Sequence, residues 1–396
     1  MRIPQSKIDR IQQALRAQGL DGLFCRLSAN VLALTGHWSG HHAVAAVVPA
    51  AGRPTLLVPH TEYDDAAAHL DQTTLDLEAY AFESVTELRS LPASLAVALP
   101  GLFQRLGLER GLIGVELSAE DGAPARMGGD FRFPAEPTWA MLRRTFPHAA
   151  LRDAGDLLGR LRWVKSQPEI EAIRKAIEIA SLGFAAAQAA IRPGLTEAEL
   201  AAAIEAAILS QGTGRNGARL SRGFAAVYAG ARSAQQHTHW AAPTGHPIAP
   251  DDWVILELGS VTDGYWSDLT RHVCAGAPSD KALRIYEIVL EAQRQGLAQA
   301  RPGAPVGGID RACRAYIQSA GYGDFFPHPS GHGVGYNYHE GPPNHSAFGE
   351  PLEPGMVLCV EPGIYLPGEF GIRAEDIIVI TETGAELLSH YPHQVA

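Results

Sequence analysis

Residues 250–271 read PDDWVILELGSVTDGYWSDLTR, and residues 354–376 read PGMVLCVEPGIYLPGEFGIRAED. In each stretch a proline precedes a short apolar run that reaches an acid seven residues later, Glu257 or Glu361. A tight turn then leads to a second segment with another acid, Asp268 or Glu375. Short aliphatic runs bounded by turn residues are typical of buried strands. Each stretch is therefore predicted to be a strand hairpin that carries two acids.

Carboxylates on buried strands are unfavourable unless they are paired or bound to a cation, and four on two hairpins cannot neutralise one another. Together with His332, the four acids have the composition of a site for a hard divalent metal. The alternative is a set of acids at strand ends that face water.

A longer repeat surrounds these hairpins. Residues 188–191 and 297–300 each continue into Arg-Pro-Gly (192–194 and 301–303), and a second apolar stripe at helical spacing follows each one. The C-terminal half is therefore predicted to be a pseudo-twofold duplication, each copy being a helix pair and a strand hairpin. Two such copies facing each other would place their acids around one centre.

The N-terminal part is predicted to be a small mixed α/β domain, and the boundary falls near residue 160, giving domains 1–160 and 161–396. Its predicted strands are 22–25, 43–49, 55–58 and 112–116, and its predicted helices are 5–18, 84–106 and 136–147. A long helix over residues 168–188 is predicted to open the second domain.

The composition is typical of a soluble enzyme. A net charge of −11 argues against nucleic acid or an anionic membrane as the main partner. The N-terminus is an amphipathic stretch with no secretory signal, and no apolar run has the length of a membrane span. Four cysteines lie far apart, at Cys25, Cys274, Cys313 and Cys359. They fit reduced thiols in a cytoplasm better than disulfides or a thiolate zinc site.

The segments GYWSDLTR (264–271), GHGVG (331–335), HE (339–340), EPGIY (361–365) and RAED (373–376) resemble, in order and spacing, the pita-bread metallopeptidases. This family includes Xaa-Pro dipeptidase (prolidase) and aminopeptidase P. The resemblance covers residues 160–396, and the preceding domain also resembles the family's N-terminal domain. It implies a creatinase/aminopeptidase fold, a homodimer, and cleavage of the bond before a proline at the second position of a small peptide.

The resemblance also implies two divalent ions, manganese, cobalt or zinc, with a bridging water as the nucleophile. The ligands would be Glu257, Asp268, His332, Glu361 and Glu375. Hard oxygen donors with one imidazole suit these metals. A pair of such ions can lower the pKa of a bound water and polarise the scissile carbonyl.

The same resemblance suggests roles for further residues. Glu361 is the candidate proton acceptor. His339 would protonate the leaving proline nitrogen, and His328 would line the substrate pocket, although loop histidines are often only solvated. Tyr365 would donate to the oxyanion, and Arg373 would orient a carboxylate or contact substrate. A histidine is also expected upstream of the first acid, either His237 or, at the preferred distance, His239.

Glu257 departs from the family, which has Asp at this position. Both ions could bind after the backbone retreats, one site could weaken, or the metals could be lost. In the last case the chain would be a metal-free C–N hydrolase acting on a small non-peptide substrate, resembling creatinase or ectoine hydrolase, or a non-catalytic binding protein. The choice between dipeptidase and aminopeptidase stays open. So does the role of Trp38, His41 and His42, either a polar loop or a contribution to a partner's active site.

Overall fold

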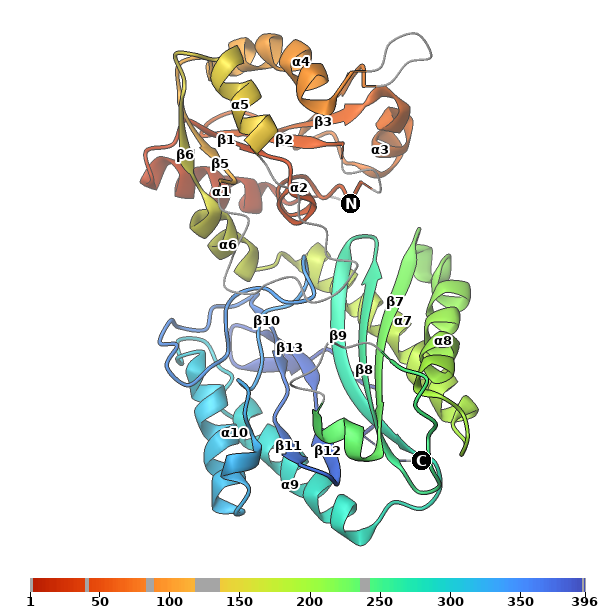
Figure 1. Ribbon diagram of the computed structural model, residues 1–396. Coiled ribbons are helices and arrows are strands. Elements are labelled where there is room, and N and C mark those ends of the chain that lie inside the picture. Colours follow the sequence, from red (N-terminus) through yellow and green to blue (C-terminus); the bar gives the residue numbers. More distant parts are fainter. Residues whose placement is uncertain are drawn as a thin grey trace. The chain divides into compact units, whose positions relative to one another are not determined.

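The computed structural model describes residues 3–39, 43–82, 89–117, 136–235, 243–393 and 395. The chain divides into two compact units, one ending at Arg162 and the other running from Trp163 onward (Figure 1). Within the described residues, no helix is both long and apolar enough to cross a membrane.

The N-terminal unit is built on a six-stranded sheet with the order β4-β3-β2-β1-β5-β6. Strands β1 and β2 and strands β2 and β3 are antiparallel, whereas the pairs β3–β4, β1–β5 and β5–β6 are parallel. The strands are β1 Gly22–Cys25, β2 Ala45–Pro49, β3 Thr55–Pro59, β4 Asp76–Tyr80, β5 Leu112–Val115 and β6 Ala150–Asp153.

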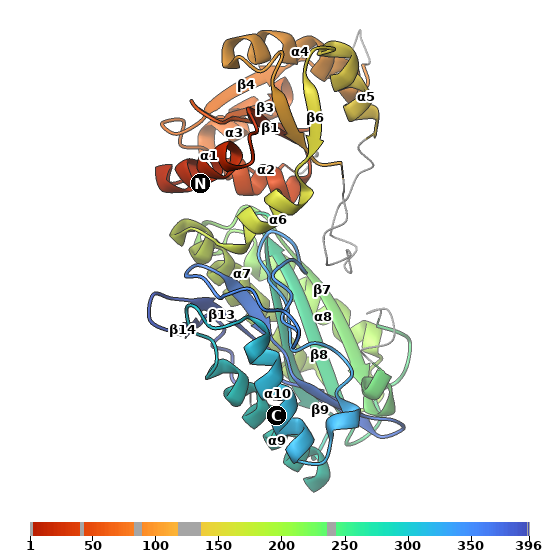
Figure 2. The same cartoon turned by 90° about the vertical axis from the view of Figure 1, so that its left-hand side faces the viewer.

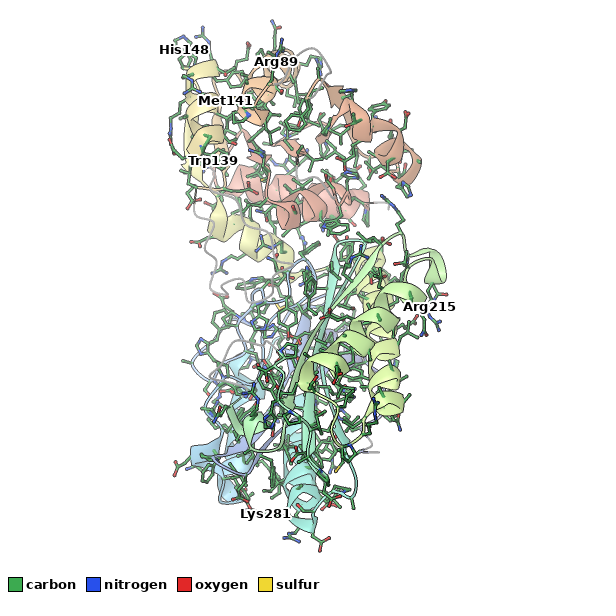
Figure 3. The ribbon with its side chains drawn as sticks, turned by 45° about the vertical axis from the view of Figure 1, so that its right-hand side comes forward. Arg89, Trp139, Met141, His148, Arg215 and Lys281 are labelled. Atoms are coloured by element: carbon green, nitrogen blue, oxygen red, sulfur yellow. The ribbon has the colours of Figure 1, made fainter. Side chains whose placement is uncertain are left out.

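Helices cover both faces of this sheet. Alternate residues of β1 point to opposite faces, and each face packs against its own set of helices. Leu23 and Cys25 pack in one core with residues of α1 (Gln5–Ala17), α2 (Ser28–Thr35), α3 (Tyr63–His69) and α6 (Gly155–Trp163). Phe24 packs in a second core with α4 (Leu91–Leu106) and α5 (Glu136–Thr145). Trp139 and Met141 of α5, both labelled in Figure 3, belong to this second core.

The predicted mixed α/β class is confirmed, and the four predicted strands appear with shifts of up to two residues at their ends. The predicted helix 84–106 begins at Leu91 in the described part of the chain, where Ser90 is the N-cap. Strands β4 and β6 were not predicted. Both contain exposed or half-buried polar residues, so they lack the apolar run that marks a buried strand.

The C-terminal unit contains the predicted two copies of a helix pair followed by paired strands (Figure 2). The first copy has α7 (Gln167–Ala190), α8 (Glu197–Ala207), β7 (Ser221–Ala229), β8 (Trp253–Thr262) and β9 (Tyr265–Cys274). The second has α9 (Asp280–Leu297), α10 (Gly307–Ser319), β10 (Val357–Val360), β11 (Gly363–Leu366), β12 (Phe370–Arg373), β13 (Asp376–Ile380) and β14 (Ala385–Leu387).

Both Arg-Pro-Gly segments lie just beyond the end of the first helix of a pair. Gly194 and Gly303 have φ values of 85° and 79°, a conformation that glycine adopts without strain. The preceding proline cannot continue a helix, so the chain turns there toward α8 or α10. Helices α9 and α10 lie side by side in both Figure 1 and Figure 2.

The first hairpin is continuous. Strand β8 pairs with β9 without interruption from Trp253↔Cys274 to Thr262↔Tyr265, and β7 pairs with the other edge of β8. Asp263 and Gly264 form the predicted turn with φ values of 51° and 89°, as a two-residue hairpin loop requires. Every residue of β8 and β9 is buried.

The second hairpin is divided. Strand β10 pairs with β13, and β11 pairs with β12, so Glu361-Pro362 and Ala374-Glu375 lie between the two pairs. Arg373 and Glu375 therefore do not share one strand, because β12 ends at Arg373 and β13 begins at Asp376. Pro362 has no N–H to donate, which prevents an unbroken ladder at this point.

Candidate metal centre

The four acids and His332 gather in one buried cluster of the C-terminal unit. Asp268 and Glu375 are at most 1% exposed, and Glu257, His332 and Glu361 are each 9% exposed. His332 Nε2 lies 3.4 Å from Asp268 Oδ2 and 3.6 Å from Glu361 Oε1. Acids from both hairpins therefore approach the same imidazole.

In the first hairpin, the pairing register of β8 and β9 determines which face of the sheet carries the two acids. Asp268 is paired with Gly259 and Glu257 with Thr270, so these four residues share one face of the sheet. Gly259 has no side chain, which leaves space opposite Asp268. The Thr270 hydroxyl donates to Glu375 Oε2 at 2.7 Å and so connects the two hairpins.

His332 arrives from a loop that lies against β10. Cys359 N donates to His332 O at 2.8 Å, and Glu361 N donates to Ser330 O at 2.8 Å. A side chain at Gly331 would meet the Cys359 carbonyl oxygen at 2.0 Å, so only glycine allows this approach. His332 Nδ1 lies 2.9 Å from Gly333 O and must donate to it. In the neutral imidazole the lone pair then lies on Nε2, the atom nearest to Asp268 and Glu361.

Asp310 of α10 supports this loop, a role that was not predicted from the sequence. Its Oδ1 accepts from Ser330 N at 2.8 Å and from Ser330 Oγ at 2.7 Å. Burial raises the pKa of Asp310, but bonds from Ser346, Ser330 and Arg314 outweigh burial and lower the pKa below its usual value. The ionised carboxylate thus holds the histidine loop in place.

Three polar atoms of the cluster have no hydrogen-bond partner in the described part of the chain. They are Asp268 Oδ1, His332 Nε2 and Glu375 Oε1, all buried. An unpaired buried polar atom is unfavourable, and two carboxylates and a neutral imidazole are donors that a divalent cation accepts. The arrangement therefore fits a metal ion held by Asp268, His332 and Glu375, with Glu361 beside His332.

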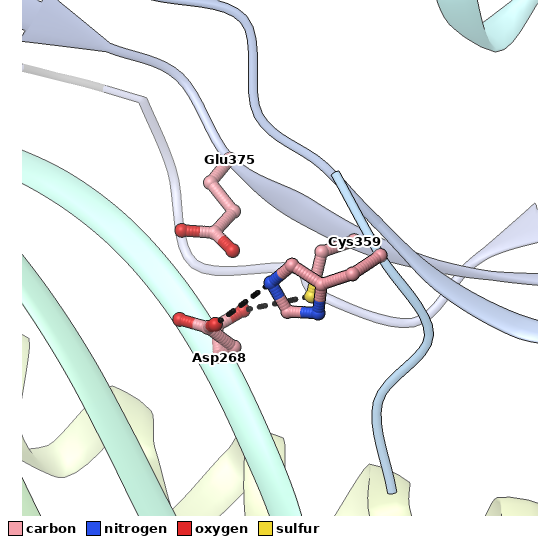
Figure 4. A group of neighbouring side chains, drawn as sticks. Asp268, Cys359 and Glu375 are labelled. Carbon is pink, nitrogen blue, oxygen red and sulfur yellow. Dashed lines mark hydrogen bonds and ion pairs between the residues drawn. The ribbon is translucent and has the colours of Figure 1, made fainter. Parts of the chain in front are cut away.

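Cys359 also belongs to this cluster and was missed as a site residue. Single ligand-type atoms of Asp268, His332, Cys359 and Glu375 lie within 4.8 Å of one another, and Figure 4 labels Asp268, Cys359 and Glu375 in this group. Cys359 lies two residues before Glu361, so strand alternation could have revealed it. Burial, with the charges of Glu375 and Asp268, raises the pKa of the Cys359 thiol well above its usual value.

Arg373 carries the positive charge that faces the acids. Its Nη2 lies 3.0 Å from Glu257 Oε2 and 3.6 Å from Glu375 Oε2, and its Nη1 lies 3.4 Å from Glu361 Oε2. Thr270 Oγ1 accepts from Arg373 Nε and Nη2 at 2.9 and 2.7 Å. Arg373 thus contacts three of the predicted ligands.

His272 holds the backbone of Arg373 from behind. Trp253 Nε1 donates to His272 Nδ1 at 2.7 Å, so Nε2 carries the hydrogen and donates to Arg373 O at 2.8 Å. Burial lowers the pKa of His272 to about 3, so this imidazole stays neutral.

Glu257 is fully engaged by its neighbours. Its Oε2 pairs with Arg373, and its Oε1 accepts a hydrogen bond of 2.6 Å from the Tyr338 hydroxyl. Tyr338 is 1% exposed and was not predicted as a site residue. Its position directly before His339 is the only signal in the sequence.

Burial opposes ionisation of two of the acids, Glu361 and Glu375, when no metal ion is bound. Burial raises the pKa of Glu361 to about 7, although Arg373 and His332 lower it. Burial and the neighbouring Asp268 raise the pKa of Glu375 well above its usual value. Burial also raises the pKa of Asp268, but His332 and His339 outweigh that effect and lower it. A bound divalent ion would allow the remaining acids to ionise together.

His339 and His328 contact different members of the predicted catalytic group. His339 Nε2 lies 3.6 Å from Asp268 Oδ2, and the His339 ring lies 3.8 Å from the His332 ring, centroid to centroid. His328 Nδ1 lies 2.8 Å from Pro329 O, so its Nε2 accepts from the Tyr365 hydroxyl at 2.8 Å. Glu340 of the HE pair instead forms a buried ion pair of 2.9 Å with Lys165.

Several predicted positions lie outside the described residues, namely His237, His239, His41 and His42. Trp38 is described and is half-buried in the N-terminal unit.

Two family models match the chain. The model of metallopeptidase family M24 matches residues 171–382, and that of the creatinase/prolidase N-terminal domain matches residues 7–164. The peptidase YqhT of Bacillus subtilis is 30% identical over 391 residues, covering 98% of this chain and 99% of YqhT. The Xaa-Pro dipeptidase of Pyrococcus furiosus is 39% identical over 234 residues, covering 59% of this chain and 65% of that protein.

Solved structures agree with these matches. The prolidase of Pyrococcus horikoshii OT3 aligns with a TM-score of 0.76 at 28% identity, covering 99% of this chain and 100% of that one. An Xaa-Pro dipeptidase of Bacillus anthracis aligns with a TM-score of 0.80 at 27% identity, covering 99% of each chain. Because both domains are matched over nearly the whole chain, the protein is a peptidase of metallopeptidase family M24.

Proposed function

We propose that this peptidase is a metal-dependent hydrolase of small peptides with proline at the second position, and that it cleaves the bond before the proline. The observation that carries this proposal is the group of three buried, unpartnered atoms, Asp268 Oδ1, His332 Nε2 and Glu375 Oε1. The names of the relatives, prolidase and Xaa-Pro dipeptidase, supply the substrate class.

A bound manganese, cobalt or zinc ion would supply activation of a water molecule and polarisation of the scissile carbonyl. Glu361 then accepts the proton of the attacking water. Arg373 Nη1 lies 3.4 Å from Glu361 Oε2 and stabilises the ionised form that accepts a proton.

The nitrogen of an Xaa-Pro bond carries no hydrogen and must be protonated before it leaves. We assign this step to His339, which lies beside His332 and 3.6 Å from Asp268 Oδ2. Tyr365 donates to His328 in this arrangement, so it can donate to a substrate oxygen only after that hydrogen bond is exchanged.

The proposed setting is the cytoplasm. All four cysteines are buried and unpaired, which fits a reducing compartment. The homodimer implied by the family resemblance stays a prediction.

Hydrolysis of Ala-Pro, Leu-Pro and a longer Xaa-Pro peptide, followed by chromatography, tests the proposal. Activity is expected on Xaa-Pro bonds, to be lost with EDTA and to return with manganese, whereas Ala-Ala serves as the control without proline. The relative rates on the dipeptides and the longer peptide distinguish a dipeptidase from an aminopeptidase. Activity that survives EDTA, or activity only on small non-peptide amides, would contradict the proposal and favour a metal-free C–N hydrolase.

A further inference from the structure

We infer that Arg271 of β9 is a positioning residue for the metal centre. Together with the segment 389–393, it holds the main chain of Glu375, so that the carboxylate of Glu375 stays beside Asp268 and His332. The inference rests on the proposed metal-dependent function and adds residues that do not touch the ion. It is carried by the hydrogen bonds that join β9, Glu375 and this segment.

Glu375 lies outside the regular strand pairing of the second hairpin. Strand β12 ends at Arg373, and the pairing of β10 with β13 begins only at Val360↔Asp376. The Glu375 side chain is nevertheless fully buried and keeps Oε1 without a hydrogen-bond partner in the described part of the chain. An acid outside the ladder can present this oxygen in one direction only if other groups hold it.

Strand β9 holds Glu375 at both ends. The Thr270 hydroxyl donates to Glu375 Oε2 at 2.7 Å, on the sheet face that carries Asp268. Arg271 follows Thr270, so its side chain lies on the opposite face. From there Arg271 Nη1 donates to Glu375 O at 2.6 Å and to Thr270 O at 2.8 Å. One strand therefore fixes both the carboxylate and the carbonyl of the same acid.

Asp376 and Tyr391 orient the guanidinium of Arg271. Nη2 donates to Asp376 Oδ1 and to Tyr391 O, both at 2.7 Å, and Nε donates to Tyr391 O at 3.0 Å. Each of the five N–H groups of Arg271 therefore has an acceptor. Because Arg271 is 2% exposed, a substitution that removes these donors leaves the carbonyl oxygens of Thr270 and Glu375 short of a donor in a buried place.

The segment 389–393 is itself attached to the rest of the C-terminal unit. Ser389 Oγ donates to Asp376 Oδ1 at 2.6 Å, and His393 Nε2 lies 2.7 Å from Asp376 Oδ2. Tyr286 of α9 donates to His393 O at 3.1 Å. The guanidinium is therefore held by groups that are themselves fixed.

The contacts need an arginine, because its donors lie in one plane and point in different directions. A lysine carries three donors on a single nitrogen and cannot reach Glu375 O and Tyr391 O in the same geometry. Loss of an outer contact that orients a metal ligand typically lowers metal affinity by about 10- to 100-fold. Arg271→Lys keeps the charge, so it tests the hydrogen bonds.

Calorimetric titration of the metal-free full-length protein with manganese tests the inference. Arg271→Lys should raise the dissociation constant by about 10- to 100-fold relative to the wild type. Ser389→Ala weakens the same network further from the acid and should raise the dissociation constant by a smaller factor, up to about 10. The visible absorption of the cobalt-loaded protein should also change in Arg271→Lys, because it reports the geometry of the ligands around the ion.

Arg162→Lys is the matched control. Arg162 is also a buried arginine, 6% exposed, and it donates to Asn30 in the N-terminal unit. This variant should lose stability without a change in manganese affinity or in cobalt absorption. Thermal melting monitored by circular dichroism shows which variants fold and how much stability each one loses.

A folded Arg271→Lys that binds manganese as tightly as the wild type would overturn this inference and leave the proposed function intact. Equal weakening in Arg162→Lys would also overturn it, because the effect would then follow global stability. If Arg271→Lys does not fold, Ser389→Ala decides, and unchanged manganese affinity in that variant refutes the inference. A wild type that binds no manganese would overturn the proposed function as well.

Discussion

The β8–β9 pair runs unbroken from Trp253↔Cys274 to Thr262↔Tyr265, whereas its counterpart is divided into β10–β13 and β11–β12 with two residues of each segment between them. In the first hairpin the acids stay within the ladder, so their direction is set by register. In the second, Glu361 and Glu375 leave the ladder.

The division allows a third segment to join the site. Glu361 N donates to Ser330 O at 2.8 Å, so the backbone beside the acid pairs with the histidine loop and not with the opposite strand. The same interruption therefore admits the loop that delivers His332. A continuous hairpin can carry acids. A divided hairpin also leaves backbone groups free to bind the loop that carries His332.

The largest effect is expected for Glu361→Gln, at the division of the second hairpin. Activity on Ala-Pro should fall by at least about 100-fold, because the amide cannot accept the water proton. The measurement is kcat on the manganese-loaded enzyme, with Glu369→Gln as the exposed control in the same hairpin. Full activity in Glu361→Gln would remove Glu361 as the base.

A smaller effect is expected for Thr270→Val, which removes the connection between the hairpins while keeping the shape. Glu375 and Arg373 both lose a hydrogen bond to the Thr270 hydroxyl. Manganese affinity should fall by about 10- to 100-fold, and the free energy of unfolding by about 1 to 3 kcal/mol. Thr383→Val, in an exposed turn, is the control. An unchanged titration would mean that the hairpins orient their acids independently.

The pH dependence of stability tests the contact between His272 and the Arg373 backbone. The pKa of His272 is about 3 in the folded state, against 6.5 for an ordinary histidine. The folded state excludes a proton that the unfolded state binds. The contribution of neutral His272 to the free energy of unfolding is therefore complete above pH 6.5 and is lost as the pH falls toward 3. The slope approaches about 1.4 kcal/mol per pH unit.

His272→Asn keeps a donor and an acceptor but cannot titrate, so its stability should fall less steeply with acid than that of the wild type. Urea unfolding between pH 7 and pH 4 measures the difference, and the constant offset above pH 7 is the internal control. Parallel curves throughout this range would show that His272 is protonated in the folded protein.

The smallest effect is expected for Gly368→Ala, in the turn between β11 and β12. Gly368 has a φ of 78° and open space around it, so the change adds only backbone strain of about 1 kcal/mol. Chemical unfolding should show this loss of stability. Manganese affinity should stay unchanged, because Glu361 and Glu375 lie at the other end of the β11–β12 pair from this turn. Gly384→Ala, in equally open space, is the control. Weakened metal binding would show that the turn and the division act as one unit.

The sequence predicted the helix pairs, the two hairpins and the buried acids because each leaves a local pattern of apolar runs and turns. The division at Pro362 was not predicted, although a proline in a strand is a warning of this kind. The contact between Glu257 and Tyr338 joins residues 81 positions apart, and no local pattern records such a pair. The support from Asp310 to Ser330 was missed for the same reason.

The reactivity of the four buried thiols can report local opening of the protein. Burial raises the pKa of Cys313 to about 12 and that of Cys25 well above the usual value, so neither reacts readily while its surroundings stay closed. Cys25 belongs to the N-terminal unit and Cys313 to the C-terminal unit. The rate at which each thiol reacts with an alkylating reagent, resolved by peptide mass, would therefore follow the opening of each unit separately.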